Sequence, residues 1–224
     1  MSRSHPRTTY FHPINVWNSV FSLAVFPISL GVIKYFPTLA VFSFGITLIL
    51  MMLYYVDLFR QHYLMYVVPI GFYVTSAMFM RVSAGNTIPP NVIILGLTIL
   101  YFFTLDVIVY QQEKSSEFAR QISLSAVILM LFTGYSYIFG LKFISQSSLV
   151  PMIVLSLILN FCLGYWFLET YRIEKSFPLM LVLLVVGFQL IWVFRVFPYG
   201  HLTLSFLYTI LFFGSLYLAV KYIQ

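Results

Sequence analysis

Long apolar stretches alternate with short polar interruptions along the whole chain. Charged residues fall near the ends of these stretches, at intervals close to the length of a membrane-crossing helix, which is about 20 apolar residues. The pattern predicts eight helices, over residues 14–34, 37–57, 62–81, 90–111, 121–142, 148–169, 177–196 and 202–222.

The predicted segments are apolar on all sides, and this feature decides between helices and strands. Strands of a membrane barrel would alternate apolar and polar residues with a period of two. A helix satisfies its backbone hydrogen bonds within the segment, as lipid requires. Proline and glycine mark several turns, at Pro37, at Pro89 and Pro90, and from Pro198 to Gly200. The sequence therefore predicts an all-α fold, a polytopic transmembrane bundle of about eight spanning helices.

Composition places the chain among membrane proteins. Of its 224 residues 61% are hydrophobic and 8% are charged, whereas soluble domains carry roughly 25% charged residues. A soluble globule of this length could not hide so much apolar surface. Aromatic residues reach 20%, which predicts rings at the level of the lipid headgroups. We interpret residues 1–224 as one transmembrane domain, and the sole cysteine, Cys162, excludes an intrachain disulfide.

The basic residues predict the orientation of the chain. The net charge is +6, but the cations are scattered singly at predicted helix ends, so no nucleic-acid partner is expected. If the N-terminus is cytoplasmic, eight Lys and Arg residues fall on that side. The other side then holds four: Lys34, Arg81, Lys142 and Arg195. Because cytoplasmic loops are enriched in Lys and Arg, we expect both termini in the cytoplasm, the cytoplasmic (plasma) membrane as location, and the lipid bilayer as partner.

A faint match between two halves, residues 14–112 and 121–224, predicts an internal duplication. Asp57 to Arg60 (DLFR) resembles Glu169 to Arg172 (ETYR), which stands at the corresponding place in the second half. The order also holds for two pairs of basic residues, Lys34 with Lys142 and Arg81 with Arg195. Four helices per half would give both halves one orientation, a 4+4 parallel repeat. The alternative is chance, since evenly spaced apolar helices align with one another in any case.

Three amide side chains fall inside predicted helices: Asn160, Gln189 and Asn18. An amide both donates and accepts hydrogen bonds, so it can replace the hydration of a solute without a fixed charge. The alternative is that these amides bond one helix to the next. An amide that faces lipid is costly, so we expect Asn160 and Gln189 to point into the bundle in either role.

Three charged residues are further candidates for a substrate site. Asp106 lies about one turn before the cytoplasmic end of the fourth predicted helix. It is either an ion or proton site, or a carboxylate that reaches the cytoplasmic interface or pairs with a neighbouring helix end such as Arg60 or Arg120. Arg81 and Arg195 end the third and seventh predicted helices. They bind an anion, or they extend to the lipid headgroups as long basic side chains commonly do.

The sequence predicts no metal site, cofactor or catalytic group. It has no histidine and cysteine spacing suited to zinc, no Gly-x-Ser-x-Gly elbow and no phosphate-binding glycine loop. Three function classes remain. We favour a small-solute transporter or the membrane subunit of one; the alternatives are a structural or assembly membrane protein and a lipid-modifying enzyme. A membrane-protein partner or a homo-oligomer is compatible with each.

Overall fold

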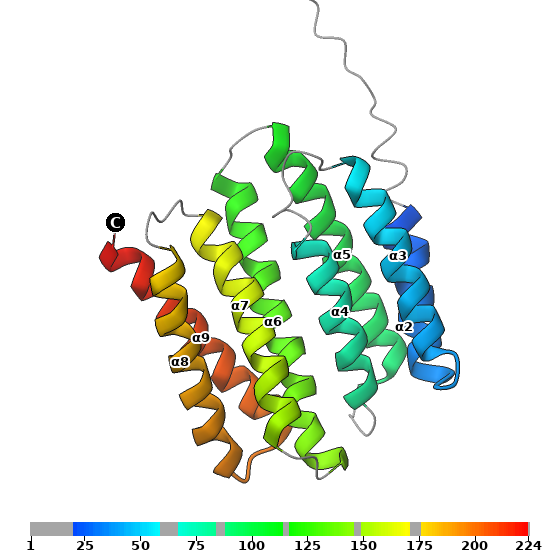
Figure 1. Ribbon diagram of the computed structural model, residues 1–224. Coiled ribbons are helices and arrows are strands. Elements are labelled where there is room, and N and C mark those ends of the chain that lie inside the picture. The colour runs from blue at the N-terminus through cyan, green and yellow to red at the C-terminus, as the bar shows by residue number, and fades with distance from the viewer. Residues whose placement is uncertain are drawn as a thin grey trace, which may run out of the picture.

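The structure, a computed structural model, describes residues 20–58, 67–83, 88–113, 117–145, 149–170 and 176–223 (Figure 1). All regular elements in these ranges are helices, which confirms the predicted all-α bundle. In chain order they are η1 (Phe21–Val25), α2 (Phe26–Tyr35), α3 (Ala40–Leu58), α4 (Val67–Val82), α5 (Pro90–Glu113), α6 (Glu117–Ser145), α7 (Leu149–Thr170), α8 (Ser176–Val196) and α9 (His201–Ile223).

The described helices follow the predicted ranges closely. The last three predicted helices, at 148–169, 177–196 and 202–222, each agree with the structure within one residue at both ends. The largest extension is in α6, which begins at Glu117 although the apolar pattern begins at 121. The polar residues there continue the helix beyond its apolar part. Hydropathy therefore marks the apolar body of a helix more accurately than its first turn.

The first rod consists of η1 and α2 and contains a π-helical turn just before Pro27. A proline has no backbone N–H to bond the carbonyl four residues earlier. The Phe26 N–H bonds the Phe21 carbonyl, five residues earlier, in the wider π geometry. Pro27 therefore coincides with a local widening of the helix.

The two halves of the chain lie side by side, with α2 to α5 on the right of Figure 1 and α6 to α9 on the left. Helix α6 is the central element, and it contacts α4, α5, α7 and α9. Its apolar segment Leu124–Lys142 is 61% buried, the largest share of the four long apolar helices. The contact of α6 with α4 and α5 joins the halves.

One end of the bundle collects the last turns of α2, α4, α6 and α8 (Figure 1). Each of these turns carries one basic residue: Lys34, Arg81, Lys142 or Arg195. The connections at this end, residues 36–39, 83–89, 146–148 and 197–200, contain no acidic residue in the sequence. We call this the basic end. The six acidic residues all belong to the opposite end of the predicted helices.

Tyrosines occupy the centre of the bundle. Tyr73, Tyr101, Tyr135 and Tyr208 are the four largest fully buried side chains. Tyr101 stacks on Phe26 with 4.2 Å between ring centroids, and Tyr208 stacks on Tyr135 at 3.7 Å. None of the four is exposed on the outside of the bundle. Their rings fill interhelical space, and a buried tyrosine hydroxyl requires a hydrogen-bond partner.

Candidate functional site

A closed polar cluster lies between α6, α7 and α9, and Asn160 of α7 is at its centre. The Asn160 side chain is completely buried, which confirms that this amide points into the bundle. Tyr135 of α6 and Tyr208 of α9 approach it from the neighbouring helices, and Ser156 lies one turn away on α7. The cluster therefore joins three helices.

Hydrogen bonds account for the polar groups of this cluster. The Tyr135 hydroxyl donates to Asn160 Oδ1 over 2.7 Å, and Asn160 Nδ2 donates to the Tyr208 hydroxyl over 2.8 Å. The Ser156 hydroxyl lies 2.9 Å from the Tyr135 oxygen. The Tyr208 hydroxyl donates to the backbone carbonyl of Gly187 on α8 over 3.2 Å. The amide thus has protein partners on both its oxygen and its nitrogen.

Gly187 allows α8 to approach this cluster. A Cβ at Gly187 would lie 2.9 Å from the Tyr208 hydroxyl and 3.2 Å from Phe212, and closer still to Asn160 Nδ2. Such distances are shorter than normal van der Waals contacts, so an alanine would push these groups apart. The space that glycine leaves is filled by Asn160 and Tyr208.

Gln189 is not part of the cluster. It is exposed on the outer face of α8, so the expectation that it points into the bundle is wrong. Gly187 and Gln189 are two residues apart, and on a helix such positions face different directions. The structure therefore separates the two amides that the sequence placed together.

The charged candidates and Asn18 have separate positions. Arg81 and Arg195 are exposed in the last turns of α4 and α8, at the basic end. Asp106 belongs to α5, but its side chain lies outside the described residues, as does the whole of Asn18.

Two lysines at the basic end hold helix ends together, a role that the sequence did not reveal. Lys34 Nζ on α2 donates to the Met80 carbonyl (3.3 Å) and to the Ser83 hydroxyl (3.1 Å) at the end of α4. Lys142 Nζ on α6 donates to the carbonyls of Arg195 (2.7 Å) and Phe197 (3.4 Å) at the end of α8. A cation near a helix C-terminus satisfies carbonyls that have no partner within the helix and favours the negative end of its dipole.

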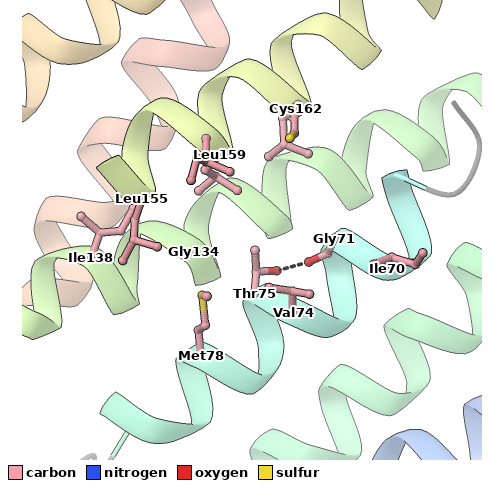
Figure 2. Close-up of a pocket in the computed structure, with 12 residues that line it drawn as sticks. Ile70, Gly71, Val74, Thr75, Met78, Gly134, Ile138, Leu155, Leu159 and Cys162 are labelled. Carbon is pink, nitrogen blue, oxygen red and sulfur yellow. Dashed lines mark hydrogen bonds between the residues drawn. The ribbon is translucent and has the colours of Figure 1, made fainter. Parts of the chain in front are cut away.

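A groove of about 350 Å³ lies at the junction of the two halves, between α4 and α7 (Figure 2). Its lining residues are almost all apolar, and they include Val74 and Met78 on α4, Gly134 and Ile138 on α6, and Leu155, Leu159 and Cys162 on α7. Thr75 is the one described lining residue with a hydroxyl, and that hydroxyl donates to the Gly71 carbonyl of its own helix over 2.9 Å. The groove therefore offers an apolar surface.

The groove runs along the helices and opens to the side of the bundle. Its lining extends from Ile70 to Met78 on α4, nine residues or about 12 Å of helix. Ile158 is 56% exposed and Cys162 is exposed, so the α7 side of the groove reaches the surface. Arg81 follows Met78 by one turn of α4, which puts a cation beyond the end of the groove.

The signal that could have revealed the cluster is the presence of tyrosine in the middle of apolar runs. Tyr135 and Tyr208 each lie well inside a predicted apolar helix, away from its polar ends. Each hydroxyl therefore required an internal partner. The groove left no comparable sign, because its apolar lining residues resemble those of any other interhelical contact.

Comparison of the chain with protein-family models, with curated proteins and with solved structures found no match.

Proposed function

We propose that the protein is an integral membrane protein in which eight helical rods cross the bilayer. Four helices are long and apolar enough to cross a membrane by length and composition: those containing Leu124–Lys142, Val150–Leu168, Phe177–Val196 and His201–Lys221. Large apolar side chains cover the outside of the bundle; Val41 is 78% exposed and Val196 is 80% exposed. Lipid is the solvent that suits such a surface.

In this proposal the basic end faces away from the cytoplasm, and both termini are cytoplasmic. The basic end has four Lys and Arg residues, whereas the other end and the N-terminal segment have eight. The Lys and Arg bias of cytoplasmic loops supports this orientation. The test is thiol labelling in a Cys162→Ser background. Ser115→Cys should react with an impermeant reagent only from the cytoplasm, and Tyr199→Cys only from outside; the reverse pattern would invert the topology.

We further propose that the halves arose by duplication of a four-helix unit. The lysine contacts support this relation, because Lys34 and Lys142 occupy corresponding places and each bonds the end of the third helix in its own half. The stacked rings support it too. Phe26 stacks on Tyr101 in the first half, and Tyr135 stacks on Tyr208 in the second half. The sequence separation between Phe26 and Tyr135, and that between Tyr101 and Tyr208, are nearly equal to the separation between the two lysines. Equivalent contacts at nearly constant spacing are difficult to obtain by chance alignment of apolar helices.

The activity that we propose is transport of a lipid-like molecule, by this chain alone or as a membrane subunit. The observation that carries the proposal is the apolar groove at the junction of the halves. Transporters built from repeats bind their substrates at the interface between the repeats. A lipid chain would lie along the groove, and Arg81 beyond its end would pair with an anionic headgroup. A small polar solute is less well supported, because the Asn160 amide already bonds Tyr135 and Tyr208.

The test uses the full chain in vesicles that contain a phospholipid with a photoactivatable acyl chain. Cross-links should concentrate on groove residues such as Met78 and Cys162. Ile158→Trp, which fills the mouth of the groove, should abolish this concentration. Leu157→Trp is the matched control, since Leu157 is 36% exposed on the same helix but does not line the groove. Equal labelling of all lipid-facing helices, unchanged by Ile158→Trp, would contradict the proposal.

A structural or assembly role is the second candidate, and the exposed amide of Gln189 favours it. A polar side chain on the outer face of a membrane helix indicates a contact with another protein surface.

A further inference from the structure

The outer face of α8 carries a regular stripe of exposed residues with an amide at its centre. Val182, Val185, Trp192 and Val196 are between 54% and 80% exposed, and Gln189 is exposed between them. Their positions in order are 182, 185, 189, 192 and 196, with alternating spacings of three and four residues. This is the spacing of the a and d positions of a heptad, by which two parallel helices pack along a left-handed seam.

Gln189 is exposed and takes part in none of the hydrogen bonds found among the described residues. It lies seven residues before the end of α8, or about 10 Å along the axis, which is beyond the reach of a glutamine side chain. Only 28% of the span Phe177–Val196 is buried, the smallest share of the four long apolar spans. An amide left in lipid at this depth is unfavourable, so a polar group from outside the bundle would stabilise it.

We infer that this face of α8 binds the same face of a second copy, and that the two Gln189 side chains pair across the interface. All copies of a membrane protein insert in one orientation, so two α8 helices related by a two-fold axis along the membrane normal run parallel. Identical residues then meet at the same depth. An amide is its own complement, because each Gln189 donates from its nitrogen to the oxygen of the other.

The remaining stripe residues suit this arrangement. With Gln189 at an a position, Val182 and Val196 also occupy a positions, where β-branched residues favour two-stranded packing. Val185 and Trp192 occupy the d positions on either side of the amide. A single polar residue in such a seam fixes the register, since any shift would leave both amides without partners. The groove at the junction of the halves lies on α4, α6 and α7, so the two surfaces do not compete.

The experiment is disulfide cross-linking of the full chain in lipid vesicles, in a Cys162→Ser background. Trp192→Cys should form a product of twice the 26.0 kDa chain mass on oxidation. Ile46→Cys on α3, which is 58% exposed, is the control for random collision and should form far less. Adding Gln189→Leu should weaken dimerisation by roughly five- to tenfold, the loss expected for two average interhelical hydrogen bonds. Gln189→Asn, which keeps an amide, should restore part of it.

Several outcomes would overturn the inference. These are a monomer at all protein-to-lipid ratios, equal cross-linking at Ile46→Cys, or a cross-linked yield that Gln189→Leu leaves unchanged. A product containing a protein of different mass, with no self-linked product, would assign the stripe to another partner. The fold of each variant is checked by its unfolding transition. Gln189 is exposed, so its loss should leave the single bundle intact.

Discussion

Replacement of Asn160 by leucine tests whether the polar cluster holds the second half of the bundle together. Asparagine and leucine side chains have the same number of heavy atoms, so the change removes hydrogen bonds and leaves little cavity. Two of the lost bonds join helices: those to Tyr135 on α6 and to Tyr208 on α9. The hydroxyls of both tyrosines keep other partners, since Tyr135 retains Ser156 and Tyr208 retains the Gly187 carbonyl.

These contacts determine the expected size of the effect. Interhelical hydrogen bonds in membrane proteins contribute about 0.6 kcal/mol on average and up to about 1.7 kcal/mol. Loss of two such bonds should therefore lower the free energy of unfolding by about 1–3 kcal/mol. The buried setting favours the upper part of this range, because water does not replace the lost bonds.

The assay is reversible unfolding in mixed micelles with increasing SDS, followed by tryptophan fluorescence, to which the buried Trp166 of α7 contributes together with Trp17 and Trp192. Gln189→Leu is the matched control. It is the same amide-to-leucine change in the same half, but on an exposed face. At protein concentrations too low for association it should change the unfolding free energy by less than about 0.5 kcal/mol.

The result that would refute this reasoning is an Asn160→Leu variant with the stability of the unchanged protein, or one no less stable than Gln189→Leu. The amide would then have a purpose other than joining helices, and solute binding would become the better explanation. A double-mutant cycle with Tyr208→Phe provides an independent measurement, since the two changes should not be additive if the side chains interact.

Two further predictions use the same unfolding assay. Gly187→Ala should lower the free energy of unfolding by about 1–3 kcal/mol, because the added Cβ would collide with the Asn160 and Tyr208 side chains. The control is Gly214→Ala on α9, where an added Cβ would meet no atom within 4 Å, and it should be neutral or slightly stabilising. Lys142→Met should lower stability by about 0.3–1 kcal/mol through loss of its bonds to the carbonyls that end α8. Arg195→Met should have almost no effect on stability, since only the backbone carbonyl of Arg195 accepts the hydrogen bond from Lys142. Equal losses of stability in the two variants would contradict the capping role of Lys142.

Helix number and helix bounds could be predicted from the sequence because they depend on local properties. The transfer of an apolar segment into lipid depends on the residues of that segment, and charges and turn residues mark where it ends. For this reason the predicted helices at 177–196 and 202–222 agree with α8 and α9 within one residue. The gathering of Lys34, Arg81, Lys142 and Arg195 at one end follows from the same logic, since successive helices alternate in direction.

The candidate site could be predicted only in part. Asn160 stands out because it is an amide in an apolar run, whereas nothing in the sequence predicts Tyr135 and Tyr208 as its partners. Gln189 stood out for the same reason, yet it lies on the opposite side of its helix from Gly187 and the cluster. The lysines that cap α4 and α8 were visible in the sequence only as marks of helix ends.

The side of each helix that faces the bundle interior could not be predicted, and the physical reason is the uniform composition of the helices. A helix that is apolar all round has no stripe that identifies its inner face, because lipid and protein interior are nearly equivalent solvents for its side chains. The sequence by itself therefore determined that this chain forms helices, where they begin and end, and which residues share an end of the bundle. The tertiary structure alone decided which amide is buried and which is exposed, and that an apolar groove lies between the halves. These depend on rotation and contact between helices far apart in the chain.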